Sequence, residues 1–289
     1  MKKVYRSIIE VLTPVHIGVF DFEIFSFFEK DGYLYLVDWN KVFKDGLLFE
    51  ELKKVLNKEF ANDEEWFLYF ENEFIKKNKE IILEKNFTQL RIKINKNVNK
   101  EITSLRRNLK FNIRYFNFEK NKYLPYIPGT SLKGVLANIF NFNQIQAKNI
   151  FVSDFYLENE DKEATEIFLA QRYYIDNLFP KDKSANNFVE MFVPGTKLVG
   201  EIKIAEEINF FTNNLKPYYY LTKKNFKYFS LLPNEIKENL DNLLKNGHIP
   251  VLLGFGVGKD EAKTKYLVSF DDKKTPLGLT VLTLEEKNE

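Results

Sequence analysis

The sequence predicts an α+β fold built on ferredoxin-like sheets. Short alternating strand patterns are joined by hairpin and turn signals, and helical patterns interrupt them irregularly. The 289 residues show no internal repeat, and they are 44% apolar and 29% charged, as in an ordinary globular protein with a large core. We therefore expect a single unit over residues 1–289, with one or two such sheets and a mainly helical insertion at about 39–86.

The first strands follow from alternation and from one turn. Residues 4–12 alternate as a strand that ends at Thr13-Pro14. Residues 23–29 and 33–37 flank Asp31-Gly32, and Asp-Gly between two such segments is a strong hairpin signal. The chain is therefore expected to begin with a strand and a hairpin.

From Asp38 to about Lys85 the apolar residues recur at helical spacing. Asn62 can cap a helix, because its side chain can accept an N–H of the first turn. The apolar residues that then fall near one face are Trp66, Phe67, Phe70, Phe74, Ile81 and Ile82. We expect these side chains to be core and the insertion to cover a sheet.

The rest of the chain continues the mixture of strands and helices. Strands are expected at 89–94, 111–118, 150–156, 188–193, 197–204, 266–270 and 279–284, and helices at 131–140, 142–149 and 234–245. The strands 188–193 and 197–204 are expected to flank a tight turn at Pro194-Gly195.

Residues 123–136 are the most informative segment, and they read Tyr-Leu-Pro-Tyr-Ile-Pro-Gly-Thr-Ser-Leu-Lys-Gly-Val-Leu. The prolines favour an extended approach, and Gly129 allows a turn before a helix that begins at Thr130 or Ser131. Either hydroxyl can cap that helix. The free N–H groups, the helix dipole and Lys133 all favour a bound anion such as a phosphate. The spacing is not that of the phosphate loop of nucleotide triphosphatases.

Positive charge is concentrated just before this segment. Between Lys85 and Phe116 the single acid is Glu101, so the stretch carries +8 while the rest of the chain carries −6. The nine basic residues are Lys85, Arg91, Lys93, Lys96, Lys100, Arg106, Arg107, Lys110 and Arg114. Such a stretch indicates either a surface that holds a polyanion or a solvated charged face.

A second glycine-rich stretch lies near the end of the chain, where residues 253–260 read Leu-Gly-Phe-Gly-Val-Gly-Lys-Asp. Glycine at every second residue permits close approach, either to an RNA phosphate or to a neighbouring chain segment. Neither the dinucleotide fingerprint nor the phosphate-loop pattern fits this spacing.

Few residues suit catalysis or metal binding. His16 could act as a general acid or base in RNA cleavage, or it could be a packed histidine that bonds a turn. Asp21 and Glu23 could bind a metal or lie on the solvent side of a strand. With no cysteine and two histidines, we expect no disulfide, no metal and no cofactor. No apolar run approaches the roughly 20 residues of a membrane span, so we expect a cytoplasmic protein with no membrane partner.

Three motifs occur together in this chain, namely Thr13-Pro14-Val15-His16-Ile17-Gly18, Tyr126-Ile127-Pro128-Gly129-Thr130-Ser131-Leu132-Lys133-Gly134 and Gly254-Phe255-Gly256-Val257-Gly258. Together they resemble the motifs of the RAMP superfamily of CRISPR proteins. Within the superfamily, their order looks most like that of the Csm-type subunit at the head end of type III-A effector complexes. The resemblance implies a ferredoxin-like, RRM-like RAMP core.

The resemblance also implies an RNA-binding surface. Gly129, Thr130, Ser131 and Lys133 would lie against the backbone of the guide RNA. Gly254, Gly256 and Gly258, followed by Lys259, would form the glycine-rich loop, with His16 and Gly18 nearby. Arg106 and Arg107 carry the charge that suits phosphate contact.

The function implied is a non-catalytic subunit of a type III-A CRISPR effector in antiviral defence, which caps the filament at the 3′ side of the guide RNA. Its partners would be the guide RNA and the backbone RAMP subunit, with target RNA and host nucleases that trim the guide as further candidates. The alternative is an RNA endonuclease of the same superfamily. It would cleave target RNA with Asp21 and a metal, or process the guide with His16.

Overall fold

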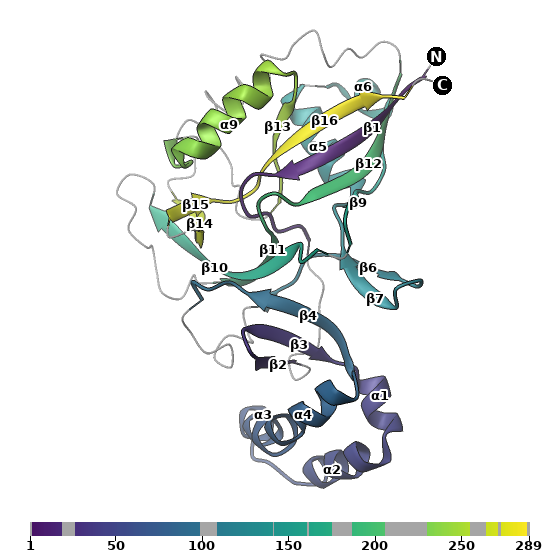
Figure 1. Ribbon diagram of the computed structural model, residues 1–289, viewed down its shortest axis with the longest axis vertical. Coiled ribbons are helices and arrows are strands. Elements are labelled where there is room, and N and C mark those ends of the chain that lie inside the picture. The colour runs from purple at the N-terminus through teal and green to yellow at the C-terminus, as the bar shows by residue number, and fades with distance from the viewer. Residues whose placement is uncertain are drawn as a thin grey trace.

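The computed structural model describes residues 2–18, 27–98, 109–140, 142–160, 162–174, 187–205, 230–254, 264–270 and 273–287. Its described part is elongated, with one sheet beside the two chain termini, a second sheet in the middle and a helical region at the far end (Figure 1). This arrangement confirms the predicted α+β class.

The first sheet has six strands in the order β13-β16-β1-β12-β8, and β9 also pairs with β12. The strands are β1 (Lys2–Val11), β8 (Ile150–Val152), β9 (Tyr156–Leu157), β12 (Lys197–Ala205), β13 (Ile249–Leu252) and β16 (Leu279–Glu286). The helices that belong with it are α5 (Gly129–Ile139), α6 (Gln144–Lys148) and α9 (Asn234–Lys245). The sequence β1, α5, β8, β12, α9, β13 is the β-α-β-β-α-β order of the ferredoxin-like motif, with β16 added between β13 and β1.

The second sheet has eight strands. They lie in the order β15-β14-β10-β4-β3-β2, while β11 pairs with both β10 and β5. The strands are β2 (Phe27–Lys30), β3 (Tyr33–Val37), β4 (Thr88–Ile94), β5 (Leu109–Lys110), β10 (Thr165–Tyr174), β11 (Asn187–Phe192), β14 (Thr264–Phe270) and β15 (Lys273–Pro276). A separate hairpin, β6 (Arg114–Asn117) with β7 (Lys122–Pro125), leads directly into the segment before α5.

The helical insertion lies between β3 and β4. Its elements are α1 (Trp39–Lys44), α2 (Gly46–Leu56), α3 (Asp63–Phe70), a π-helical turn η2 (Glu71–Ile75) and α4 (Lys76–Glu84). Phe70 and Phe74 are buried against Phe28 and Val37 of the β2–β3 hairpin, which confirms that the insertion covers a sheet. The predicted cap is also confirmed, because the Asn62 side chain accepts the Glu65 N–H.

The expected core position of Ile81 was wrong, since this side chain is 39% exposed while Ile82 is fully buried. The π-helical turn before α4 adds one residue to the local repeat, and so a face counted at 3.6 residues per turn shifts beyond it.

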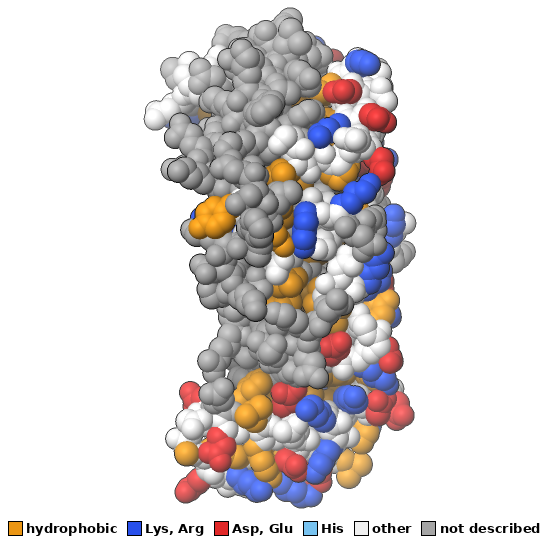
Figure 2. All heavy atoms as spheres, turned by 90° about the vertical axis from the view of Figure 1, so that its left-hand side faces the viewer, with side chains coloured by type: hydrophobic (Ala, Val, Ile, Leu, Met, Phe, Trp, Pro, Cys, Tyr) orange, Lys and Arg blue, Asp and Glu red, His pale blue; other side chains and the backbone are white. Residues whose placement is uncertain are grey.

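On the face of the insertion seen in Figure 2, basic, acidic and apolar side chains are interspersed.

The turn at Pro194-Gly195 does not close a hairpin. The strands on either side of it, β11 and β12, belong to different sheets, so the turn carries the chain from the second sheet to the first. Gly195 has φ +81° and donates its N–H to Val11 O at the end of β1. The turn is thereby fastened to the first sheet.

Candidate nucleic-acid interface

Helix α5 begins at Gly129, and not at Thr130 or Ser131 as the sequence suggested. Pro128 is the N-cap residue with φ −60° and ψ 134°, and no side chain of the helix caps it. Instead, the Gly129 N–H donates to Asp154 Oδ1 at 2.9 Å, and the Ser131 N–H donates to Pro128 O at 2.9 Å. The predicted hydroxyl cap is therefore wrong, because a carboxylate from the segment between β8 and β9 takes that role.

The outer side of α5 remains open beyond this carboxylate. Leu132 and Leu136 are fully buried in the core of the first sheet, whereas Thr130 and Gly134 are exposed and Lys133 is half-buried. No acidic partner of the Lys133 ammonium is found in the described part of the chain. Asp154 already takes the first N–H of the helix, so the groups on this side that suit an anion are the exposed Thr130 hydroxyl and the Lys133 ammonium.

The two glycines of this motif serve different purposes. A Cβ at Gly129 would lie 2.2 Å from Val152 O and 2.4 Å from Ser153 O, so this position is glycine because α5 packs directly on the backbone that follows β8. A Cβ at Gly134 would meet no described atom within 4 Å. Internal packing therefore explains Gly129, while Gly134 leaves space on the open side of the helix.

The basic segment is not a uniform positive surface. Lys85 pairs with Asp45, and Lys93 pairs with Glu166 at 2.7 Å. Arg114 forms an ion pair with the fully buried Glu190. Acids far away in the sequence thus neutralise much of the +8 counted along the chain. Arg106 and Arg107 lie outside the described residues, and their proposed phosphate contact stays a prediction.

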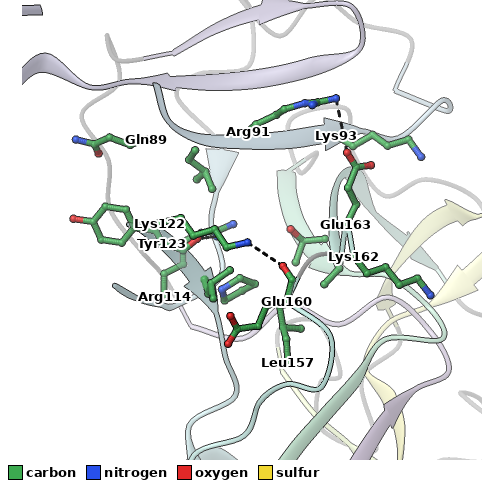
Figure 3. A pocket seen from close by; sticks show the side chains of 15 residues that line it. Gln89, Arg91, Lys93, Arg114, Lys122, Tyr123, Leu157, Glu160, Lys162 and Glu163 are labelled. Atoms are coloured by element: carbon green, nitrogen blue, oxygen red, sulfur yellow. Dashed lines mark hydrogen bonds and ion pairs between the residues drawn. The ribbon is translucent and has the colours of Figure 1, made fainter. Parts of the chain in front are cut away.

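A cavity of about 370 Å³ lies between β4 and the β6–β7 hairpin (Figure 3). The charged residues that line it are Arg91, Lys93, Arg114, Lys122, Glu160, Lys162 and Glu163. Lys122 Nζ donates to Glu160 O at 3.0 Å, and Arg91 lies 3.9 Å from Glu163. Charges of both signs line this cavity and several of them are already paired, so it is not a uniformly positive site for an anion.

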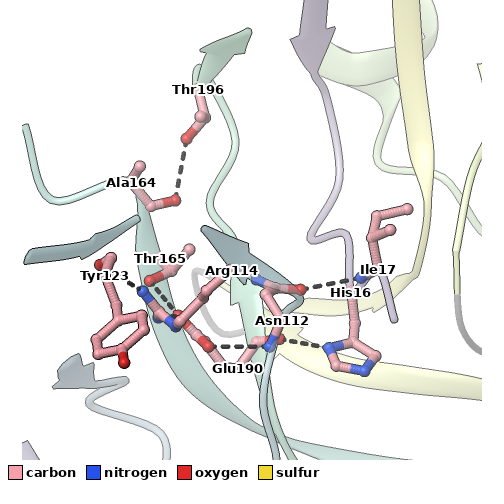
Figure 4. A network of polar contacts seen from close by, with 9 residues as sticks. All are labelled: His16, Ile17, Asn112, Arg114, Tyr123, Ala164, Thr165, Glu190 and Thr196. Carbon is pink, nitrogen blue, oxygen red and sulfur yellow. Dashed lines mark hydrogen bonds and ion pairs between the residues drawn. The ribbon is translucent and has the colours of Figure 1, made fainter. Parts of the chain in front are cut away.

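A buried polar network joins the two sheets behind this surface (Figure 4). Glu190 on β11 accepts the Asn112 N–H at 3.0 Å and the Thr165 hydroxyl at 2.6 Å, in addition to its ion pair with Arg114. Asn112 Oδ1 in turn accepts the Ile17 N–H at 2.9 Å. The carboxylate therefore ties β11 to the turn after β1 and to the start of the hairpin that leads to α5.

His16 belongs to this network. Its side chain is 2% exposed, and Nδ1 lies 2.9 Å from the Glu190 backbone oxygen, so Nδ1 carries the proton that is donated. The structure thus shows the packed histidine, with its ring turned away from solvent. Burial lowers the pKa of His16, against the smaller opposing effect of the bond to Glu190, so the ring is neutral at neutral pH.

The first glycine of the late glycine-rich stretch lies against the same turn. Gly254 has φ +89°, and a Cβ there would come within 2.1 Å of His16 O. Of the two possibilities for this stretch, close approach to a neighbouring chain segment thus holds at Gly254. Gly18, with φ +76°, is exposed nearby and faces Ile113. Gly256, Gly258 and Lys259 lie outside the described residues, as does Asp21, and their proposed roles stay predictions.

Asp154 is the site residue that sequence reasoning missed. It is 25 positions from Gly129, in no recognisable motif, and the pairing of Ile127 with Phe155 brings it to the helix end. In the described part of the chain, no group of three or more His, Cys, Asp or Glu side chains could hold a metal ion. Among the described helices, none has the length and apolar character needed to span a membrane.

Comparison with known proteins identifies the superfamily. The sequence profile of the RAMP superfamily matches residues 8–263, and the chain belongs to this superfamily. The fold is similar to a chain of the Csm–crRNA–target RNA ternary complex of a type III-A CRISPR-Cas system, with a TM-score of 0.61 and 14% identity over 96% of this chain and 100% of that one. It is also similar to T. onnurineus Csm5, with a TM-score of 0.56 and 14% identity over 95% of this chain and 99% of that one. No curated protein matches the sequence. The expected RAMP fold is thereby confirmed.

The Glu190 network predicts a large effect of one substitution. Arg114→Met leaves the Glu190 carboxylate buried without its countercharge, and we expect the free energy of unfolding to fall by about 3–5 kcal/mol, as for other buried pairs that lose one partner. Arg6→Met, which breaks exposed pairs with Glu158 and Glu285, is the control and should cause little change. Denaturant unfolding measures both, and equal effects would contradict a central role for Glu190.

The two motif glycines predict opposite effects on stability. Gly129→Ala forces backbone apart at Val152 and should destabilise strongly, whereas Gly134→Ala should stabilise α5 by about 0.5–1 kcal/mol, because alanine loses less backbone entropy. Melting temperatures of the two variants check this. Destabilisation by Gly134→Ala would show that this side of the helix is packed rather than open.

The lowered pKa of His16 predicts a loss of stability in mild acid. The unfolded chain binds a proton near pH 6.5 while the folded chain does not, so His16 stabilises the fold above that pH and this contribution is lost as the pH falls below it. We expect wild type to lose more stability between pH 7 and pH 5 than His16→Gln, measured by denaturant unfolding. If the free energies of unfolding of wild type and His16→Gln fell in parallel with pH, His16 would take up its proton equally well in the folded and unfolded states.

Proposed function

We propose that this chain is a non-catalytic, guide-RNA-binding subunit of a type III-A CRISPR effector complex, located at the 3′ end of the guide. The observation that carries the proposal is the likeness, over nearly the whole of both chains, to Csm5 and to a chain of a Csm–crRNA–target RNA complex, in a member of the RAMP superfamily. In this role its partners are the guide RNA and the backbone RAMP subunit. Target RNA and guide-trimming nucleases are further candidates, and the effector would work in the cytoplasm.

The open side of α5 supports contact with the RNA backbone rather than with its bases. Thr130, Ser131 and Lys133 offer hydroxyls and one ammonium at a helix N-terminus, and these groups suit phosphate oxygens. A guide must also keep its bases available for pairing with a target, so a subunit that holds the backbone fits this task.

A nuclease that uses His16 is disfavoured by the enclosed position of the imidazole. A general acid or base has to reach the proton that it transfers, and the His16 ring is buried and bonded to Glu190.

A nuclease that uses Asp21 and a metal is tested by incubation of the complex with labelled guide and target RNA, with magnesium or with chelator. We expect intact RNA in each case, and cuts that disappear in Asp21→Asn would contradict the non-catalytic role.

The proposal predicts a salt-dependent effect of Lys133. Lys133→Ala removes one phosphate contact, so the slope of log Kd against log salt concentration should fall by about 0.7 for single-stranded RNA, and binding at low salt should weaken. Binding of the full chain to labelled guide RNA over a range of salt concentrations measures this.

Lys245→Ala is the matched control, because it removes an exposed lysine in the last turn of α9, away from the motif. It should leave the slope as in wild type. The same slope for wild type and Lys133→Ala would contradict the proposed contact.

A further inference from the structure

Three tyrosines from separate segments form a cluster beside the start of α5. Tyr115 lies on β6, Tyr126 precedes the helix, and Tyr156 lies on β9. The rings of Tyr126 and Tyr156 are stacked, with centroids 5.9 Å apart and planes 21° apart. Tyr115 meets both of them edge-on, at 4.9 Å from Tyr156 and 6.0 Å from Tyr126. Nothing in the sequence distinguished these three among its 44 Phe and Tyr residues.

Strand alternation turns two of these rings away from the core. Ile127 and Phe155 form an antiparallel bridge, and both side chains are fully buried. Successive side chains of extended backbone point to opposite faces, so Tyr126 and Tyr156 project from the other face. Tyr156 is 41% exposed, so the stacked pair presents ring surface to solvent.

The hydrogen bonds of the three hydroxyls show which rings are available to a ligand. Tyr115 donates to Glu160 Oε1 at 3.2 Å, and its edge supports the other two rings. The hydroxyls of Tyr126 and Tyr156 bond to no residue in the described part of the chain. Burial raises the pKa of all three phenols, so they stay neutral at physiological pH. The stacked pair is therefore an uncharged aromatic surface on a fixed support.

Asp154 lies beside this surface. It directly precedes Phe155, which pairs with Ile127, and its Oδ1 accepts the N–H of Gly129 just after that pair, so the carboxylate is held near Tyr126 and Tyr156. In keeping with this, its charge contributes to the raised pKa of both phenols. A carboxylate repels phosphate but accepts hydrogen bonds from the N–H groups of bases. The charge next to the rings thus favours a base there and leaves the phosphates to Lys133.

We propose that Tyr126 and Tyr156 form a stacking platform for one unpaired base of single-stranded RNA whose backbone follows the open side of α5. The inference rests on the proposed function and adds a base-binding position to it. Aromatic side chains stack on bases in many proteins that bind single strands, and this contact tolerates any base because every base has a π face. Tyr115 and Glu160 act as positioning residues that hold the platform.

The test is binding of fluorescein-labelled, unstructured guide RNA to the full chain at several salt concentrations. The variants are Tyr156→Ala, Tyr126→Ala with Tyr156→Ala, and Tyr156→Phe, with Lys133→Ala in parallel. Tyr174→Ala is the matched control, because Tyr174 is 40% exposed on β10 of the second sheet. Circular dichroism melting of each variant identifies any loss of folding.

We expect Tyr156→Ala to weaken binding about fivefold or more and the double variant to weaken it further, because a stacked base is lost. The salt slope should stay that of wild type, since stacking releases no counterion. Tyr156→Phe keeps the ring and should bind like wild type, as should Tyr174→Ala.

Two results would overturn the platform. Wild-type binding by the folded double variant, together with weaker binding by Lys133→Ala, rejects the platform and leaves the proposed function standing. Absence of RNA binding by wild type at every salt concentration rejects both.

Discussion

The buried ion pair between Arg114 and Glu190 is the constraint that ties the second sheet to the β6–β7 hairpin, and the path of the chain to α5 depends on it. Glu190 is fully buried, and its carboxylate also accepts bonds from Asn112 and Thr165. A buried charge is tolerated only when its partners are held in place, so the segments that supply these partners must arrive together for the fold to be stable. They come from the second sheet and from the stretch that leads into the β6–β7 hairpin.

This constraint also positions the candidate RNA surface. The hairpin whose first strand starts at Arg114 continues through Pro125 to the segment before α5, and the bridge between Ile127 and Phe155 fastens that segment to the first sheet. Gly129 then lets α5 lie directly on the backbone that follows β8. The open side of α5 and the tyrosines beside it are therefore held by backbone pairing and close backbone packing, which favours a fixed path for a bound strand.

Local signals in the sequence were sufficient for much of the secondary structure. Helix α9 was expected at 234–245 and is found there, and β3 was expected at 33–37 and is found there. Both predictions succeeded because the signals are local, namely a strong apolar period and a turn that contains glycine. Strand β10 was not predicted, because Glu166, Gln171 and Arg172 interrupt the alternation of apolar and polar residues. These polar residues fit in a strand only because β10 pairs with β4, β11 and β14, which are distant in sequence. The RAMP motifs in turn indicated the fold class correctly.

The candidate site was harder to predict, because its properties come from residues that are distant in sequence. The sequence suggested a Thr130 or Ser131 cap beside free N–H groups, yet Asp154 takes the first N–H of the helix. It left the basic segment as either a polyanion surface or a solvated charged face, yet Glu166 and Glu190 neutralise two of its cations. Burial of His16 depends in the same way on Glu190 and Gly254. No local pattern carries this information, since each of these contacts joins separate strands or turns.

The central claim is that α5 holds the guide backbone, and a cryo-EM structure of this chain assembled with guide RNA and the backbone subunit tests it most directly. The account predicts a phosphate on the open side of α5, within hydrogen-bond distance of Lys133 Nζ and away from Asp154, near the 3′ end of the guide. Protein from another subunit over this side of α5, with the RNA on a different face, would contradict it.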